Sequence, residues 1–271
     1  MARVLCISSF VARGHVGLAA LLPALNGLGH ETVALPTIVL SNHPGHPRFS
    51  KLEVPATTLI DMISVYEHAG WLKDIDCVLT GYLPSVVHVA AAVNAIAKIR
   101  EVNPAVLVVC DPVLGDDPYG LYIPNAAATA LRDGLLPFAN IITPNRYELA
   151  WLSGLPVSTL QDAVAAAKTL RAPMALITSL PSGPVAVGNL LVQADQESLR
   201  TVPLLQSVPH GTGDFMGALF TGHLLTGCGP EKALGLTVAG VHAVAQRSQG
   251  RDELLVVADS AAWTHPAALE P

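Results

Sequence analysis

The chain has 271 residues, of which 51% are hydrophobic and 13% charged, with a formal net charge of −6. Its 15 Lys and Arg residues are dispersed singly, without the basic stripe that binds the phosphates of nucleic acid. No apolar stretch approaches the roughly 20 residues of a membrane-spanning helix, and residues 1–10 lack the features of a secretory signal. We therefore expect a cytoplasmic protein that binds neither nucleic acid nor membrane.

Length and spacing also limit the architecture. A chain of this length suits one large α/β domain or two small ones. No linker rich in Gly, Ser and Pro divides it and no internal repeat is visible, so we predict a single domain over residues 1–271. The cysteines have neither zinc-site spacing nor the number needed for a disulfide scaffold. We expect reduced thiols at Cys6, Cys77, Cys110 and Cys228.

In the first half of the chain, short runs of β-branched residues alternate with longer runs rich in Ala and Leu. The β-branched runs predict strands at 3–8, 31–40, 76–82, 105–113 and 140–145. The apolar spacing between them predicts helices at 15–29, 55–70, 85–100 and 125–136. Strands that are apolar on both faces and followed by helices are typical of a parallel sheet covered on both sides. We predict a three-layer α/β/α fold with a mainly parallel central sheet.

The alternation stops between about residues 173 and 202. Three consecutive strands are predicted there, at 174–180, 184–192 and 197–204, joined by polar turns. Such hairpins are expected at an edge of the sheet. Two helices follow, at 212–226 and 230–248, and Pro230 opens the second.

Polar residues follow the predicted strands, where ligands of open α/β sheets bind. They are Ser8, Ser9, Ser41, Asn42, His43, Gly81, Tyr82, Asp111, Thr143, Asn145, Thr178 and Ser179. Tyr82 offers a flat face to an aromatic ring, and Ser9 and His43 offer hydrogen bonds. Each also has a structural interpretation, because Tyr82 could be a packing residue and His43 a turn residue.

Acidic residues are prominent in two of these segments. Asp111 and Asp116 in "CDPVLGD" could hold a hard cation, or they could serve an Asx-type turn. In "ITPNRYELAWLSG", Asn145 is a sufficient helix cap, whereas Glu148 in the first turn could favour the helix dipole or bind metal. Together these acids could share one magnesium ion that carries nucleotide phosphates.

The segment "HGTGDFMGALFTGHLL", residues 210–225, places Asp214 at the start of an apolar helix. In the structural interpretation, Asp214 favours the helix N-terminus by its charge. In the functional one, free N–H groups of Gly211, Thr212 and Gly213 bind an anion while Asp214 removes a proton beside it. Neither "GxxxxGK[ST]" nor "GxGxxG" follows the first strand. If the ligand is a nucleoside triphosphate, "GTGD" must therefore be its phosphate cradle.

The segment "HGTGDFMGALFTG" resembles the "GTGD" signature of the ribokinase-like superfamily, whose members transfer the γ-phosphoryl group of ATP to a hydroxyl group. "ISSFVARGHVG" followed by "SNHPGH" looks like pyridoxal kinases, which have a Ser-His-Val, Arg-Gly, Val-Gly series and then "SNHTG". "LTGYL", "VVCDPVLGD", "LYIP" and "ITPNRYEL" follow in the family's order. The resemblance covers about residues 3–250. It implies a ribokinase-like fold and phosphorylation of the 5′-hydroxymethyl group of pyridoxal, with pyridoxine and pyridoxamine as further acceptors.

The resemblance also implies a role for each candidate residue. Asp214 would be the catalytic base, and the pyridine pocket would be lined by Ser9, Val16, His43 and Tyr82. ATP would be bound by Asp111, Asp116, Tyr122, Thr143, Asn145, Glu148, Thr178, Ser179, Gly211, Thr212 and Gly213. Asp111 and Glu148 would also bind Mg²⁺. Tyr122 is expected over the phosphates, in a short mobile loop. K⁺ or Na⁺ beside Mg²⁺ and a homodimer are further expectations.

The chain departs from the pyridoxal kinase pattern at several substrate positions. Pro44 replaces a hydroxyl residue, Leu40 stands where an aromatic residue is common, and Phe10 replaces the histidine of "SHV". A cysteine before the last helix, which would indicate a covalent hemithioacetal, is missing from residues 210–213. The alternatives are a kinase of hydroxymethylpyrimidine, a nucleoside or another small alcohol, and a non-catalytic protein that binds vitamin B6.

Overall fold

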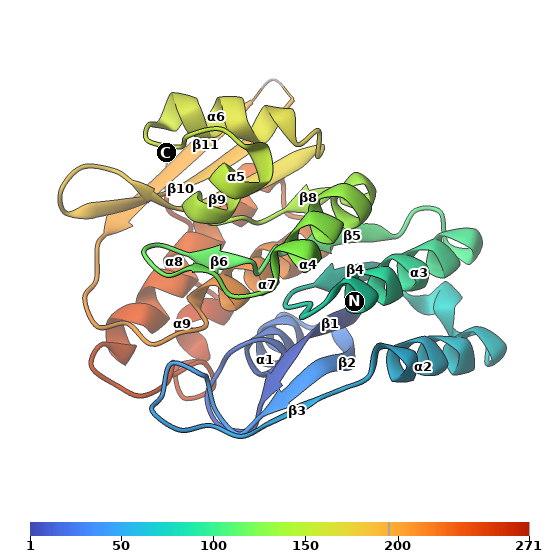
Figure 1. Ribbon diagram of the computed structural model, residues 1–271. Helices are drawn as coiled ribbons and strands as arrows, with labels where there is room; N and C mark the ends of the chain where they lie inside the picture. Colours follow the sequence, from blue (N-terminus) through green and yellow to red (C-terminus); the bar gives the residue numbers. More distant parts are fainter. Residues whose placement is uncertain (195, 271) are drawn as a thin grey trace.

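The computed structural model describes residues 1–194 and 196–270, and its central feature is a nine-stranded sheet (Figure 1). The strand order is β11-β10-β9-β8-β5-β4-β1-β2-β3. The sheet strands are β1 (Arg3–Val11), β2 (Glu31–Leu40), β3 (Lys51–Glu53), β4 (Cys77–Thr80), β5 (Leu107–Cys110), β8 (Ile141–Ile142), β9 (Met174–Pro181), β10 (Ala186–Gln193) and β11 (Glu197–Pro203). A separate hairpin is formed by β6 (Gly115–Asp116) and β7 (Gly120–Leu121).

Six adjacent strands, from β2 to β9 in spatial order, are parallel. The strands added at the two edges are antiparallel: β3 pairs with β2, β10 with β9, and β11 with β10. The predicted change from crossover connections to hairpins after residue 173 is therefore confirmed. Parallel strands end at one edge of a sheet, so the loops that follow them converge there.

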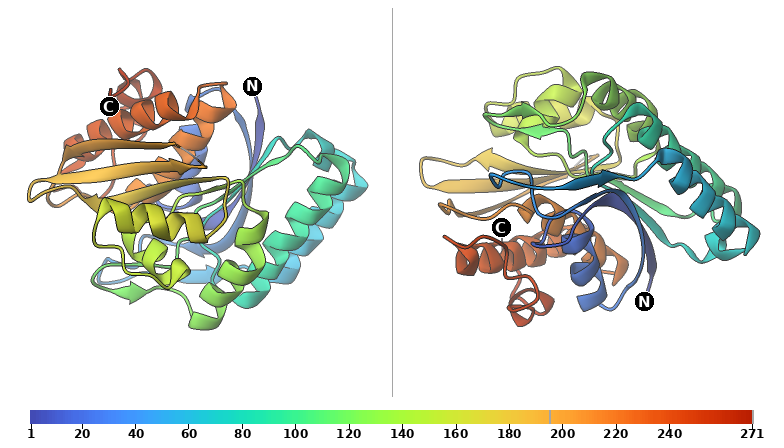
Figure 2. Two further views of the ribbon diagram at one scale, coloured as in Figure 1. Left: turned by 90° about the horizontal axis from the view of Figure 1, so that it is seen from above. Right: turned by 60° about the horizontal axis from the view of Figure 1, so that its bottom comes forward.

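Helices cover both faces of the sheet, as Figure 2 shows. One layer contains α2 (Ala56–His68), α3 (Val86–Val102), α4 (Asn125–Ala130), α5 (Arg146–Ser153) and α6 (Leu160–Thr169). The other contains α1 (Leu18–Gly27), α7 (Thr212–Leu225), α8 (Pro230–Ser248) and α9 (Ala261–Thr264). Short turns of helix, η1 (Trp71–Asp74), η2 (Leu131–Leu135) and η3 (Leu136–Phe138), complete the chain.

Strand β1 shows why both faces are covered. Successive side chains of a strand point to opposite faces. Val4 and Cys6 pack under α1 and α7, whereas Leu5 and Ile7 pack under α2 and α3. All four side chains are buried. The predicted three-layer α/β/α fold is confirmed.

Several boundaries differ from the prediction. Strand β1 continues to Val11 through a register shift between Ser8 and Phe10, so Ser8 and Ser9 lie inside the strand and not after it. Helix α1 begins only at Leu18, because Gly14 and Gly17 have positive φ angles of 98° and 57°. Helix α6, strand β3 and the β6–β7 hairpin were not predicted.

None of the helices within residues 1–194 and 196–270 is long and apolar enough to cross a membrane. Cys6, Cys77 and Cys110 are free and buried, and Cys228 is free and half-buried.

Candidate functional site

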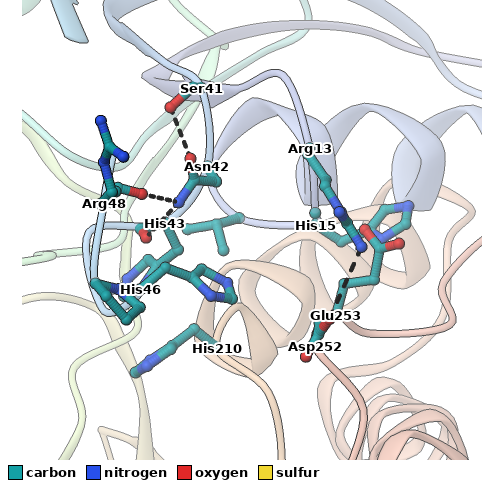
Figure 3. A pocket seen from close by; sticks show the side chains of 13 residues that line it. Arg13, His15, Ser41, Asn42, His43, His46, Arg48, His210, Asp252 and Glu253 are labelled. Atoms are coloured by element: carbon teal, nitrogen blue, oxygen red, sulfur yellow. Dashed lines mark hydrogen bonds and ion pairs between the residues drawn. The ribbon is translucent and has the colours of Figure 1, made fainter. Parts of the chain in front are cut away.

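Two cavities lie on either side of the turn before α7. The first, which we call the His43 cavity, measures about 410 Å³ and is shown in Figure 3. Its lining is Arg13, Gly14, His15, Val16, Ser41, Asn42, His43, His46, Pro47, Arg48, His210, Asp252 and Glu253. The second, the Thr212 cavity, measures about 300 Å³ and lies between the ends of β9 to β11 and helices α7 and α8. His210 lines one cavity and Thr212 lines the other, so the Gly211 turn separates them.

Only glycine fits at position 211 of this turn, because of its backbone angle and a close contact with His15. Its φ angle is +108°, and a Cβ atom built on it would lie 1.9 Å from the carbonyl oxygen of His15. Helix α7 begins at Thr212, with no side chain capping its first N–H groups. A Cβ on Gly213 would meet nothing within 4 Å. The start of α7 therefore presents unpaired backbone N–H groups beside open space, which suits an anion.

Asp214 lies in the first turn of α7 and is half-buried. Burial raises its pKa to about 6, and a hydrogen bond from the backbone N–H of Gly17 opposes that rise. Asp214 lines neither cavity and follows the Gly211 turn that separates them. Gly17 also touches Ser9, because a Cβ on Gly17 would lie 2.4 Å from Ser9 Oγ. The structure thus brings Asp214 and Ser9 into contact with the same glycine.

Asp111 faces the same helix from the end of β5. It is buried and accepts a hydrogen bond of 3.0 Å from Thr143 Oγ1. A Cβ on Gly217 of α7 would lie 3.7 Å from Asp111 Oδ2. Burial and the neighbouring Asp214 carboxylate raise the pKa of Asp111 to about 8, while the Thr143 hydroxyl opposes the rise. Such a proton affinity favours a bound cation or a neutral acid at this position.

Glu148 is buried near Asp111, and its carboxylate accepts hydrogen bonds from backbone N–H groups. Oε2 accepts the N–H of Asn145 and Oε1 accepts the N–H of Leu114, both at 2.9 Å. Asn145 Oδ1 in turn accepts the N–H of Glu148, which completes a capping box. Burial and Asp111 raise the pKa of Glu148 despite these donors. The sequence left open whether Glu148 serves the helix, and the capping box shows that it does.

The acids fit a magnesium site only if a ligand completes it. Among the described residues, no three His, Cys, Asp or Glu side chains are grouped closely enough to hold a metal ion by themselves. Mg²⁺ commonly uses one or two carboxylates together with substrate phosphates and water. Asp111 and Glu148, which repel each other, match the protein's part of such a site.

Many of the residues predicted to bind ATP do meet in the Thr212 cavity. They are Asp116, Asn145, Thr178, Ser179, Thr212 and Gly213. Thr178 and Ser179 were predicted to follow this strand, but they lie within β9 at a bulge. Ser179 has a φ angle of +60° there. The bulge makes these residues resemble a strand end in the sequence.

Five residues predicted to bind ATP do not line this cavity. Gly211 belongs to the turn that separates the two cavities. Asp111, Thr143 and Glu148 lie beneath the strand ends, as described above. Tyr122 follows the β6–β7 hairpin, its side chain is 49% exposed, and its N–H donates to the carbonyl of Leu114. Strand β7 ends at Leu121, so Tyr122 lies in the bend after the hairpin, and its position over the phosphates stays a prediction.

The residues predicted to bind the pyridine ring are divided. Val16 and His43 line the His43 cavity. Tyr82 packs with Val16 against the buried side chains of Ile38 and Leu40, which is the packing role considered for it. Ser9 reaches the site only through Gly17, as described above. Leu40, where an aromatic residue was expected, is buried in that small cluster.

Sequence reasoning missed residues that the fold brings to the cavities from distant segments. His210, Arg13, Asp252 and Glu253 line the His43 cavity (Figure 3), and Arg13 and Asp252 form an exposed ion pair of 3.8 Å. Asn189 of β10 and His242 of α8 line the Thr212 cavity. "RGHVG" and "HGTGD" contain two of these residues, but the others have no local signal.

Comparisons with known proteins identify the family of this chain. The family model described as phosphomethylpyrimidine kinase matches residues 54–252. Pyridoxal kinase PdxY of Corynebacterium diphtheriae is 34% identical over 97% of this chain and 96% of its own. The pyridoxine/pyridoxal/pyridoxamine kinase of Bordetella avium is 37% identical over 85% of this chain and 80% of its own.

Among solved structures, pyridoxal kinase from Leishmania donovani in complex with ADP and pyridoxamine superposes with a TM-score of 0.93. The two sequences are 26% identical, and the match covers 99% of this chain and 98% of the other. The chain therefore belongs to the family of pyridoxal and phosphomethylpyrimidine kinases, within the ribokinase-like superfamily.

Proposed function

We propose that this protein transfers the γ-phosphoryl group of ATP to the 5′-hydroxymethyl group of pyridoxal, with pyridoxine and pyridoxamine as further acceptors. The position of Asp214 carries the proposal. Its carboxyl group, with a pKa raised to about 6, lies directly after the turn that separates the two cavities. Two relatives are named pyridoxal kinase and pyridoxine/pyridoxal/pyridoxamine kinase. The related structure from Leishmania donovani contains ADP and pyridoxamine.

The chemistry follows from this position. Asp214 accepts the proton of the alcohol while the alcohol oxygen forms a bond to the γ-phosphorus. The bond between the γ-phosphorus and the β-phosphate oxygen breaks, and ADP leaves. The N–H groups of Gly211, Thr212 and Gly213 stabilise the transferring charge. Asp111 and Glu148 would hold Mg²⁺, which neutralises phosphate charge when bound.

The His43 cavity is the proposed vitamer pocket. Val16 excludes water and His43 offers hydrogen bonds to ring substituents. Ser9, which contacts Gly17, and Tyr82, in the cluster that also contains Val16, are proposed to support the pocket rather than to line it. The Thr212 cavity is the proposed nucleotide pocket, in which Asn145, Thr178 and Ser179 supply the polar lining and Asp116 lies at its margin. Tyr122 is proposed to cover the phosphates from the β6–β7 hairpin.

A second candidate acceptor is hydroxymethylpyrimidine. The family model that matches residues 54–252 is described as phosphomethylpyrimidine kinase. Pro44, in the loop after β2, also removes a hydroxyl group that pyridoxal kinases have beside the substrate. The same general base and anion site would serve either alcohol.

The test is ADP formation by the purified protein with Mg²⁺, ATP and each acceptor in turn: pyridoxal, pyridoxine, pyridoxamine and hydroxymethylpyrimidine. The proposal predicts the highest kcat/KM with pyridoxal. A higher value with hydroxymethylpyrimidine would establish the second candidate. No ADP formation with any acceptor, together with a melting temperature raised by pyridoxal but not by Mg-ATP, would show a non-catalytic binding protein.

We further propose that the protein is a cytoplasmic homodimer built from a single domain over residues 1–271, and that K⁺ or Na⁺ supports its activity. The resemblance supports these features, and Phe49 and Leu52 supply exposed apolar side chains at the β3 edge for a dimer contact. Light scattering and activity in K⁺, Na⁺ and choline salts test the dimer and the monovalent ion.

A further inference from the structure

Asn189 of β10 is a polar side chain on an apolar face of the sheet. Alternation along β10 directs Leu190 and Val192 into the core under α5 and α6, and Leu191 into the core under α7 and α8. Asn189 therefore shares its face with Val187 and Leu191. Val187 and Asn189 both line the Thr212 cavity, and Asn189 is only 4% exposed. An apolar residue would satisfy the packing at this position, so the amide needs another explanation.

The backbone around Asn189 is irregular in a way that directs this side chain. Gly188 pairs with Leu180 of β9 and Leu190 pairs with Ile177, so Asn189 alone opposes both Thr178 and Ser179. Ser179 has the positive φ angle of this bulge. Bulges beside binding sites commonly change the direction of a side chain. All three residues of this irregular pairing line the Thr212 cavity.

The side-chain amide of Asn189 makes no hydrogen bond with any residue that the structure describes. Other asparagines do: Asn140 Oδ1 accepts the N–H of Val108 at 2.8 Å, and Asn103 Nδ2 donates to the carbonyl of Ile75 at 2.9 Å. Asn189 is not among the described residues with fully buried, unpaired polar atoms, so its amide keeps some exposure at the Thr212 cavity that the residue lines. A donor and an acceptor side by side, directed into a cavity, form a recognition group for a ligand.

The surroundings of Asn189 define the ligand. Much of the Thr212 cavity is apolar, formed by Val187, Val202, Leu204, Leu205, Val208, Met216, Val238, Val241 and Ala245. Aliphatic walls of this kind suit a flat ring system. The phosphate-binding turn at Thr212 and Gly213 lines the same cavity, which places the base of a nucleotide against the apolar part.

We propose that Asn189 recognises the 6-amino edge of adenine and makes the Thr212 cavity selective for adenine nucleotides. The amide oxygen accepts from the 6-amino group while the amide N–H₂ donates to the adjacent ring nitrogen, a pairing that an Asn side chain makes well. This inference rests on the proposed nucleotide-dependent function and specifies how its donor is chosen.

The test compares wild type with Asn189→Leu, using ATP and purine riboside triphosphate, which lacks the 6-amino group. One neutral hydrogen bond corresponds to about 2- to 10-fold in affinity. Wild type should show a KM for ATP lower than that for the analogue by this factor. Asn189→Leu removes two hydrogen bonds to ATP but only one to the analogue, so it should raise the KM for ATP by the larger factor and abolish the difference between the two KM values, with kcat nearly unchanged. Equal effects on both nucleotides, or none on ATP, would overturn the inference.

Controls separate this result from misfolding and from failure of the proposed function. Gln193→Leu, at the end of β10 and outside the cavity, should leave both KM values unchanged. Asn189→Leu should melt at or above the wild-type temperature, and Asn189→Ala replaces it if it does not fold. Without any turnover, the rise in melting temperature caused by ADP against purine riboside diphosphate gives the same comparison. Asn189-dependent ADP binding without turnover would refute the kinase activity and retain this inference, whereas no preference for ADP would overturn it.

Discussion

The imidazole rings of His43 and His210 stack with their centroids 3.9 Å apart and their planes inclined by 22°. His43 belongs to the loop after β2, and His210 precedes the turn that opens α7. Gly45 lies close to both rings, since a Cβ on it would lie 2.9 Å from His43 Nδ1 and from His210 Nε2, and its N–H donates to His43 Nδ1. The stack therefore connects the proposed vitamer pocket with the proposed phosphate-binding turn.

Removal of one ring should loosen this connection. A stacked ring pair contributes about 0.5–1.5 kcal/mol, which corresponds to roughly a 2- to 10-fold change in affinity. We predict that His210→Ala raises the KM for pyridoxal by this factor with little change in kcat. His210→Phe, which restores a flat ring, should recover most of the loss. A lower kcat at unchanged KM would instead assign His210 to the phosphoryl-transfer step.

The pH dependence of catalysis should report Asp214. Its pKa is raised to about 6 by burial, and only the carboxylate form can accept a proton. We predict that kcat/KM for pyridoxal falls below an apparent pKa near 6 as the pH decreases. Steady-state rates between pH 4.5 and 8 provide the measurement. An acidic limb near pH 4, the range of an ordinary aspartate, would show that burial does not control this group.

Much of the fold follows from local patterns, whereas bulges do not. The predicted helices at 212–226 and 230–248 agree with α7 and α8 because their apolar spacing and Pro230 are local signals. The end of β1 was predicted too early, and Thr178 and Ser179 were placed after their strand although they lie within β9. A bulge introduces polar residues into a strand and depends on its pairing partner. Helix α6 was missed despite a capping box at Thr159 and Asp162.

The candidate site shows the same division. Asp214, Thr212 and Gly213 belong to one contiguous motif, so their proximity could be predicted from the sequence. The opposition of Asn189 to the β9 bulge and the contact of Gly211 with His15 depend on segments far apart in the chain. A single sequence contains no signal for such pairings.

We predict that Asp111 lowers the free energy of unfolding of the ligand-free protein at pH 7. Its folded pKa, about 8, lies above the unfolded value near 4. The folded state therefore binds the extra proton between these limits, and stability falls as the pH rises through that window. Asp111→Asn, which can keep the Thr143 hydrogen bond, should raise the free energy of unfolding at pH 7 by about 1–3 kcal/mol.

Urea denaturation of wild type and Asp111→Asn at pH 4 and pH 7 measures this effect. The two proteins should converge at pH 4 and separate at pH 7, while Mg-ATP should no longer stabilise the variant as it does wild type. A variant less stable than wild type at pH 7 would contradict the assigned pKa direction.

His223 of α7 should make the protein sensitive to acid. It is 5% exposed, its Nε2 has no partner among the described residues, and burial and His30 lower its pKa to about 4. Because the folded pKa lies below the unfolded value near 6.5, the associated stability is complete above pH 6.5 and lost as the pH falls towards 4.

The loss between pH 7 and pH 4 attributable to His223 is up to about 3 kcal/mol. His223→Leu should therefore reduce the decrease in unfolding free energy over this range, whereas His68→Leu, at an exposed site in α2, should not. Identical pH dependence in wild type and His223→Leu would show that His223 is protonated without cost.

The most direct test of the account is turnover by Asp214→Asn. This substitution keeps the size of the side chain and removes its ability to accept a proton. ADP formation with saturating Mg-ATP and pyridoxal is compared with wild type, and melting temperatures with pyridoxal and with ADP verify that both ligands still bind. We predict a folded protein that binds both ligands and whose kcat is about 10²- to 10⁴-fold lower. A kcat equal to that of wild type would remove Asp214 from the mechanism and contradict the central claim.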